Sequence, residues 1–375
     1  MTTMMTKPAV ETKSASKRIF NFSAGPATLP EEVLHQAQQD IWNIFDSGIG
    51  IMEHSHRGKV FDRVLDEAIA DCRAVGNVPD DYEIVFVQGG ATTQFAYIPM
   101  NFLPEGKTAD YLDTGVWANK AMKEAKILGK VHCAFDGSRT NYDHTPSDAE
   151  ITQTPGAAYL HYCSNNTIYG TRFNQPPRTS APLIADTSSE MYSRPIDVKA
   201  HAMIYAGAQK NLGPSGVVLV IIRKDFLASG KPGLPSMFSY AKIAEQKSCL
   251  NTPPTFGIYF MGQVFKWILR QGGLTAMEAR NNAKARLIYD AIDQSGGFYT
   301  CVSRPECRSV MNVSFRSPSP ELDDRFVAEA RKHDMDGLKG YRSVGGMRAS
   351  IYNAFPHAGC ETLAQFMREF ARKNG

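Results

Sequence analysis

Apolar runs of strand length alternate with segments of helical periodicity along residues 83–186, and this alternation restricts the fold more than any other feature. Short apolar runs bounded by turn residues indicate strands, whereas apolar residues that recur every three to four positions indicate helices. Strands that alternate with helices favour an open, mostly parallel α/β sheet with its ligand site at the carboxyl ends of the strands. The strands that we expect are 83–87, 109–113, 157–162 and 182–186, followed by 202–205 and 217–222.

A single lysine, Lys210, lies between the last two of these runs among small residues. Small residues allow the backbone or a flat ligand to come close. A buried lysine favours the neutral amine, which is a nucleophile toward carbonyl groups. The alternative is an exposed lysine at the tip of a hairpin. On composition alone this alternative is favoured by about three to one, because lysine side chains are mostly exposed.

The ends of the four strands before Lys210 carry residues suited to a flat, phosphorylated ligand. Gly89–Thr93 offers backbone N–H groups and hydroxyls to a phosphate, and Trp117 could stack on a ring. Thr167 could hydrogen-bond a ring oxygen, and Asp186 ends its strand in the expected crevice. Taken one at a time, each feature has an ordinary structural explanation. Gly89–Thr93 could be only a tight turn, Trp117 a buried structural residue, Thr167 a turn cap and Asp186 a helix N-cap. Their order favours pyridoxal phosphate, with Lys210 as the Schiff-base lysine and the acid holding the pyridine nitrogen protonated.

Composition and charge limit the other classes of function. A net charge of +3 without a block of Lys and Arg argues against nucleic acid as a partner, and no apolar run approaches a membrane span. Seven scattered cysteines without a CxxC pair indicate a reduced, cytoplasmic protein. The histidines include no HExxH motif, and His54-Ser-His56 alone is weak evidence, so we expect no metal site.

The length of 375 residues is enough for about two domains. Residues 1–17 lack an apolar core, which predicts a disordered extension rather than a secretory signal, with a mitochondrial presequence as the alternative. We expect an N-terminal segment, 18–30, that packs with the smaller domain, a large domain over 31–270, and a smaller α+β domain over 271–375.

Helices with one apolar face are expected in both domains. The residues expected to face the core are Leu34, Ala37, Ile41, Ile44 and Phe45 in the first helix, Phe61, Val64, Leu65, Ala68 and Cys72 in the second, and Leu363, Phe366, Met367 and Phe370 in the last.

Five longer motifs closely resemble the phosphoserine aminotransferase family. The resemblance covers roughly residues 18–372. It implies a fold-type-I pyridoxal phosphate transferase with a mostly parallel seven-stranded sheet flanked by helices and a smaller C-terminal domain. It also implies a homodimer with shared active sites. The motifs are NFSAGPATLP at 21–30, HSHR at 54–57, YAGAQKNLGPSG at 205–216, NTPPTF at 251–256 and GGMRASIYNA at 345–354.

Members of this family transfer an amino group between O-phospho-L-serine and 2-oxoglutarate, giving 3-phosphohydroxypyruvate and glutamate, in serine biosynthesis. The reaction is ping-pong, and its substrates are small anionic amino acids and 2-oxo acids. Carried over by position along the chain, the resemblance implies that Lys210 and Asp186 match the catalytic residues. The other residues that match cofactor contacts are Ala91, Thr92, Trp117, Thr167, Ser188 and Gln209, together with Asn251 and Thr252, which match a pair contributed by the neighbouring subunit.

Arginine suits substrates with two separate anionic groups, because its planar head binds a carboxylate or phosphate through two hydrogen bonds. Arg348 resembles the arginine that binds the α-carboxylate. His56, Arg57 and Arg342 resemble the cluster that binds the distal phosphate or carboxylate. Without the motifs, Arg57, Arg342 and Arg348 would be interpreted as surface arginines with solvated side chains.

Three positions depart from some members of the family. Thr92 stands where some have arginine, Tyr341 where some have histidine, and Ala24 where some have serine. These departures affect substrate contacts and leave the reaction class unchanged. The alternatives that stay open are another class V reaction such as cysteine desulfuration, a catalytically silent protein that binds pyridoxal phosphate, and use of phosphohydroxythreonine as an additional substrate.

Overall fold

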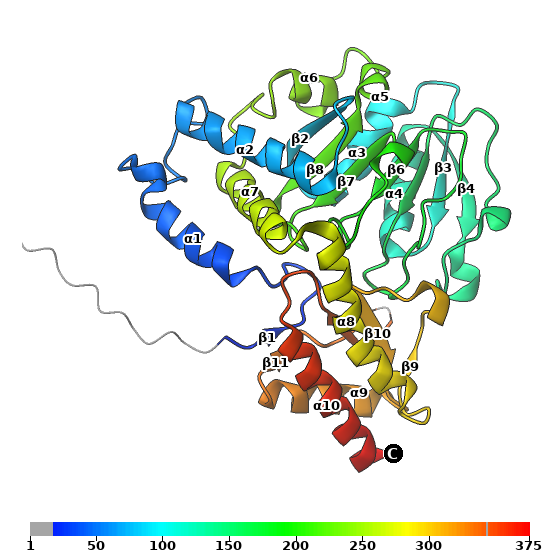
Figure 1. The fold of residues 1–375 in the computed structure, drawn as a ribbon. Helices are drawn as coiled ribbons and strands as arrows, with labels where there is room; N and C mark the ends of the chain where they lie inside the picture. The colour runs from blue at the N-terminus through cyan, green and yellow to red at the C-terminus, as the bar shows by residue number, and fades with distance from the viewer. Residues whose placement is uncertain (1–17, 343) are drawn as a thin grey trace, which may run out of the picture.

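The computed structural model describes residues 18–342 and 344–375. Within these residues a seven-stranded sheet forms the centre of the larger part of the molecule, in the order β2-β8-β7-β6-β5-β3-β4 (Figure 1). Of the seven strands, β8 alone runs in the opposite direction to the others, so the mostly parallel sheet that the sequence predicts is confirmed. The strands are β2 (Tyr82–Gly89), β3 (Thr108–Asp113), β4 (Lys130–Asp136), β5 (Leu160–Cys163), β6 (Leu183–Asp186), β7 (Met203–Gly207) and β8 (Gly216–Arg223).

The strands are apolar on both faces because helices cover both sides of the sheet. Successive side chains of a strand point to opposite faces, so Leu219 and Ile221 pack in one cluster and Val218 and Val220 in another. On the first face lie α1 (Glu31–Trp42), α2 (Lys59–Gly76) and α7 (Thr255–Arg270). On the second lie α3 (Ala91–Phe102), α4 (Val116–Leu128), α5 (Lys224–Ala228) and α6 (Tyr240–Glu245).

The C-terminal elements form a separate apolar cluster, and Figure 1 shows them grouped below the large sheet. Strands β9, β10 and β12 form an antiparallel sheet, and β1 pairs in parallel with β11. The boundary near residue 271 stays a prediction. The strand from the N-terminal segment is β1 (Phe20–Asn21), and the C-terminal elements are α8 (Gly273–Asp293), β9 (Thr300–Cys301), β10 (Asn312–Arg316), α9 (Pro320–Lys332), β11 (Met335–Asp336), β12 (Met347–Ser350) and α10 (His357–Asn374).

Short 3₁₀ helices lie in the connections between the longer elements. They are η1 (Ile44–Asp46), η2 (Gly137–Thr140), η3 (Asp148–Glu150), η4 (Val198–Ala200), η5 (Ser236–Phe238) and η6 (Pro305–Cys307).

The expected core face of α2 is confirmed, whereas that of the first helix is partly wrong. Ile41 is 44% exposed, because α1 turns Val33, Ala37 and Asp40 toward the core, and Phe45, which lies in η1 after the end of α1, is 39% exposed. The Asp40 carboxylate accepts a hydrogen bond from the Tyr259 hydroxyl of α7, which allows this acid to be buried.

One strand and two helix starts were also missed. Strand β4 was not expected, because it lies at the edge of the sheet and its residues are mostly only half-buried. Helices α3 and α4 begin at Ala91 and Val116, whereas the sequence pattern favours starts at Gln94 and Ala118, since each N-cap is a glycine without a capping side chain. The prediction for residues 1–17 lies outside the described residues. Among the described residues, no helix is both long and apolar enough to cross a membrane.

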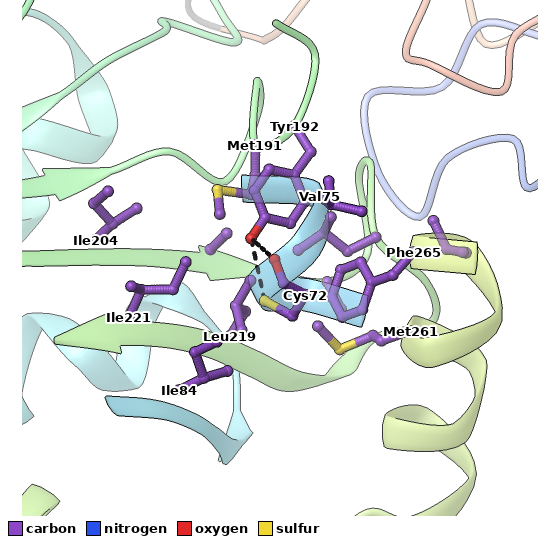
Figure 2. Packing of buried hydrophobic residues seen from close by; sticks show 14 of the residues in the cluster. Cys72, Val75, Ile84, Met191, Tyr192, Ile204, Leu219, Ile221, Met261 and Phe265 are labelled. Atoms are coloured by element: carbon purple, nitrogen blue, oxygen red, sulfur yellow. Dashed lines mark hydrogen bonds between the residues drawn. The ribbon is translucent and has the colours of Figure 1, made fainter. Parts of the chain in front are cut away.

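Figure 2 shows the packing of α2 and α7 against the sheet around Phe265, which is fully buried. The ring of Phe265 meets the ring of Tyr192 edge-on, with 5.8 Å between the centroids. The Tyr192 hydroxyl donates to the Cys72 carbonyl at 3.0 Å, which ties the chain after β6 to α2.

We expect Phe265→Ala to lower the free energy of unfolding by about 3–5 kcal/mol, because it removes a large buried ring and leaves a cavity. Urea unfolding followed by fluorescence measures this loss. Leu269→Ala, one turn further along α7 at a side chain that is 37% exposed, is the matched control and should change stability little. Equal losses for the two variants would contradict this account of the core.

Candidate active site

Lys210 lies in the connection between the antiparallel strands β7 and β8, at the carboxyl end of the parallel strands. This connection closes on itself through hydrogen bonds from the N–H groups of Leu212 and Gly213 to the Ala208 carbonyl. The lysine is half-buried at the wall of a cavity of about 110 Å³. The residues that line the cavity are Gly90, Ala91, Thr92, Phe95, Trp117, Cys163, Asn165, Thr167, Asp186, Ser188, Ser189, Gln209 and Lys210.

The amine of Lys210 is placed by contacts from two neighbouring strand ends. Its Nζ donates to Thr167 Oγ1 at 2.8 Å and lies 5.9 Å from the centroid of the Trp117 ring. Burial lowers the pKa of Lys210 to about 8, and the nearby Asp186 carboxylate works in the opposite direction. Roughly a tenth of this amine is therefore neutral and nucleophilic at pH 7, against less than a thousandth of an ordinary lysine.

Asp186 ends β6 and is buried beside this lysine. Its Oδ1 accepts a hydrogen bond from the Ser188 N–H at 2.9 Å, and the Ser188 hydroxyl accepts from the Gly207 N–H at 3.0 Å. Burial raises the pKa of Asp186, while Ser188 and Lys210 lower it. A buried carboxylate in this state gains from a cationic partner such as a protonated ring nitrogen.

The cavity fits a flat ring that carries a phosphate. The first N–H groups of α3, from Ala91 onward, have no acceptor within the helix, and the helix dipole favours an anion there. The buried Nε1 of Trp117 has no hydrogen-bond partner within the described residues. A Cβ at Gly207 would lie 2.8 Å from Oε1 of Gln209, so a larger residue there would displace the end of that side chain. Together these features suit pyridoxal phosphate.

Every cofactor contact expected before residue 211 lines this one cavity. Sequence reasoning missed four further lining residues: Phe95, Cys163, Asn165 and Ser189. The available signal was position alone, since Cys163 and Asn165 follow the third expected strand just as Trp117 follows the second. Asn165 is anchored by hydrogen bonds from its Nδ2 to Ser189 Oγ and Asn312 Oδ1.

Of the expected substrate residues, Arg348 lies nearest to this cavity. It stands on β12, and its Nη1 donates to the Thr167 carbonyl at 3.4 Å. Burial lowers the pKa of Arg348, and its Nε has no hydrogen-bond partner in the described part of the chain. Arg348 thus retains unused donor capacity close to Thr167 and Lys210. Arg342 is exposed in the turn before β12.

The remaining expected residues lie elsewhere in the chain. His56 and Arg57 line a different hollow, together with Glu245 and Cys249. Asn251 and Thr252 are exposed, and Asn251 Nδ2 donates to Gln88 Oε1 at 2.9 Å. A single chain therefore does not bring these four residues to the cavity of Lys210.

Comparison with known proteins gives a consistent result. Residues 19–363 match the model of the aminotransferase class-V family. The phosphoserine aminotransferase of Niallia circulans is 51% identical over 361 residues, which span 96% of this chain and all of the relative. Phosphoserine aminotransferase 1, chloroplastic, of Arabidopsis thaliana is 48% identical over 96% of this chain and 84% of its own length.

Solved structures agree. Phosphoserine aminotransferase from Bacillus circulans subsp. alkalophilus superimposes with a TM-score of 0.94 at 51% identity, over 96% of this chain and 100% of the other. The pyridoxal-phosphate-bound enzyme from Trichomonas vaginalis gives 0.89 at 41% identity, over 94% and 100% of the two chains. This chain therefore belongs to the class V aminotransferases and, among them, to the phosphoserine aminotransferase family of pyridoxal phosphate enzymes.

Proposed function

We propose that this protein transfers an amino group between O-phospho-L-serine and 2-oxoglutarate, giving 3-phosphohydroxypyruvate and glutamate, in serine biosynthesis. The observation that carries the proposal is the half-buried Lys210 beside the buried Asp186 in one cavity. The assignment of the substrate rests on the relatives. They are named phosphoserine aminotransferases, and about half of their residues are identical over nearly the whole chain.

Lys210 and Asp186 have separate roles at the cofactor. When bound, pyridoxal phosphate accepts the electron pair left at the α-carbon of the amino acid as its proton is removed. Asp186 keeps the ring nitrogen protonated. Lys210 would hold the cofactor covalently before substrate arrives and, once displaced, would take the α-proton and deliver it to the cofactor carbon that carries the amino group. A pKa of about 8 suits both directions of this proton transfer.

Arg348 is the group that we assign to the α-carboxylate of the substrate. It lies beside Thr167, which accepts the hydrogen bond of Lys210, so a carboxylate bound there would present its α-carbon to the amine. His56, Arg57 and Arg342 are assigned to the second anion, the phosphate of phosphoserine or the side-chain carboxylate of glutamate.

We also propose that two copies of the chain share each site. His56, Arg57, Asn251 and Thr252 stand outside the cavity of their own chain, and Arg57, Asn251 and Thr252 are exposed. Exposed apolar side chains at the end of α1 and in the loop that follows it, such as Trp42 (85% exposed) and Met52 (60% exposed), suit burial against a second copy. A homodimer would supply these groups across its interface. The free thiols of all seven cysteines support a cytoplasmic setting.

Cys163 bears on the alternative of cysteine desulfuration, because it lines the cavity. Burial raises the pKa of its thiol well above the ordinary value, with the Asp186 carboxylate adding to the effect. A thiol that stays protonated is a poor nucleophile toward the sulfur of a substrate cysteine, which desulfuration requires it to attack. Transamination is therefore the better supported reaction.

Lys210→Ala should lower kcat for phosphoserine by at least about 10³-fold, because both the covalent link and the proton carrier are lost. Lys126→Ala, at an exposed lysine of α4, is the control and should keep wild-type activity. The cofactor absorbance of the wild type should shift with phosphoserine and remain unchanged with cysteine or alanine. Turnover at the wild-type rate in Lys210→Ala would refute the assignment.

Mixing inactive variants tests the shared site. Arg57→Ala and Lys210→Ala should each be inactive alone, yet regain activity after joint refolding, because a mixed dimer holds one site with both residues intact. Lys210→Ala mixed with Asp186→Ala is the matched control, since both residues belong to the same cavity and no intact site can form. Activity in the control, or none in the first pair, argues against a distal contact across subunits.

The reactivity of Lys210 should depend on pH with a midpoint near 8 in the cofactor-free protein. Burial disfavours the ammonium form, so the neutral fraction rises as the pH passes through this value. Competitive acetylation followed by mass spectrometry measures the midpoint. In Asp186→Asn the midpoint should move to lower pH, because the carboxylate that favours the ammonium is gone. A midpoint near the ordinary lysine value of about 10.4 in the wild type would contradict the burial argument.

A further inference from the structure

Lys284, on α8, is fully buried and has no role in the cavity described above. Within the described residues, its hydrogen-bond acceptors are four backbone carbonyls of one turn rather than a carboxylate. Its Nζ lies 3.0 Å from the oxygen of Ile351, 2.6 Å from that of Tyr352, 3.4 Å from that of Asn353 and 3.2 Å from that of Phe355. Lysine is rarely buried without such compensation.

These carbonyls belong to the turn 351–355, which directly follows β12, the strand of Arg348. From this turn, the Asn353 N–H donates to Asn211 Oδ1 at 3.0 Å, and Asn211 is the residue after Lys210. The Asn353 side chain donates to the Tyr192 carbonyl at 2.9 Å, in the chain after Asp186. The turn therefore contacts the segments that carry the three main groups of the site.

The hydroxyl of Tyr352 adds a contact to the N-terminal segment, because it donates to the Ala24 carbonyl at 2.8 Å. The next residue, Gly25, lies close enough to Lys210 that a Cβ there would stand 3.4 Å from its Cγ. Holding the turn in place thus also holds the chain that packs against the lysine stem.

Four carbonyl oxygens around one nitrogen form an arrangement like the oxygen rings that replace the hydration shell of potassium ions. Burial lowers the pKa of Lys284 to about 7, and Arg280, one turn earlier, acts in the same direction. The four carbonyl oxygens accept hydrogen bonds from the amine and favour its ammonium form. A neutral amine has two hydrogens to donate and an ammonium has three, so the charged form satisfies this turn better.

We propose that Lys284 is a positioning residue for the reaction: its ammonium is a built-in cation that holds the turn 351–355 and so sets Arg348 relative to Lys210. The kinetic part of this inference rests on the proposed function, whereas the cation site itself does not.

Lys284→Met keeps the length of the side chain and removes the cation. We expect the KM for phosphoserine and for glutamate to rise about 10-fold or more, with a smaller change in kcat, because a displaced Arg348 weakens binding of the α-carboxylate that both substrates share. The matched control is Arg286→Met, on the same helix at a side chain that is 81% exposed. A KM in Lys284→Met equal to that of the control would overturn the positioning role.

Lys284→Ala leaves room for an external cation, and its rescue separates a cation site from a merely structural side chain. Ammonium or potassium chloride should raise the thermal midpoint and lower the KM of this variant, relative to lithium chloride at equal ionic strength, and should leave Arg286→Met unchanged. Recovery of folded Lys284→Ala only in ammonium or potassium would also support the proposal. The same behaviour in every salt, including failure to fold in all of them, would overturn it.

The thermal midpoint of unfolding is measured without substrate, so this test does not depend on the proposed function. Wild-type protein that cannot use phosphoserine would refute that function and leave the cation rescue of stability as the test of Lys284.

Discussion

The active site depends on the electrostatic coupling between the amine of Lys210 and the carboxylate of Asp186. Removing either charge from water costs several kcal/mol, and each group lessens that cost for the other. The fold places them together through neighbouring parallel strands, because Asp186 of β6 pairs in register with Tyr205 of β7, and Lys210 follows β7 by three residues. Burial then moves the pKa of the lysine down and that of the acid up.

The single antiparallel strand explains why a lysine in a hairpin connection can be buried. After β7 the chain turns back through residues 208–215 and returns along β8, which pairs with both β7 and β2. The connection is therefore covered by β2 and by the start of α3 instead of standing free at an edge. The hairpin expected as an alternative does exist, but its lysine faces a cavity rather than bulk water.

Much of the fold could be predicted because strands buried on both faces leave an unmistakable apolar run, as in 217–222. The edge strand β4 lacks that signal, and Ile41 and Phe45 fit the apolar period without being buried. Within the site, the strand ends were informative because parallel strands end at one edge. Cys163 and Asn165 carried no chemical signal of their own. Contacts such as Lys284 to the turn 351–355 join residues 67 to 71 positions apart and have no local pattern.

On the proposed assignment, the two anionic ends of the substrate bind to different parts of the protein. Thr167, Arg348 and Lys210 belong to one chain and are joined by hydrogen bonds, so the α-carbon and its carboxylate are positioned by the interior of a single subunit. Arg57 is exposed and lies in another hollow of its own chain. The chemistry common to all aminotransferases would thus depend on burial within one subunit, and the choice of the distal anion on how two subunits meet. A change at their interface would alter specificity before it altered the reaction.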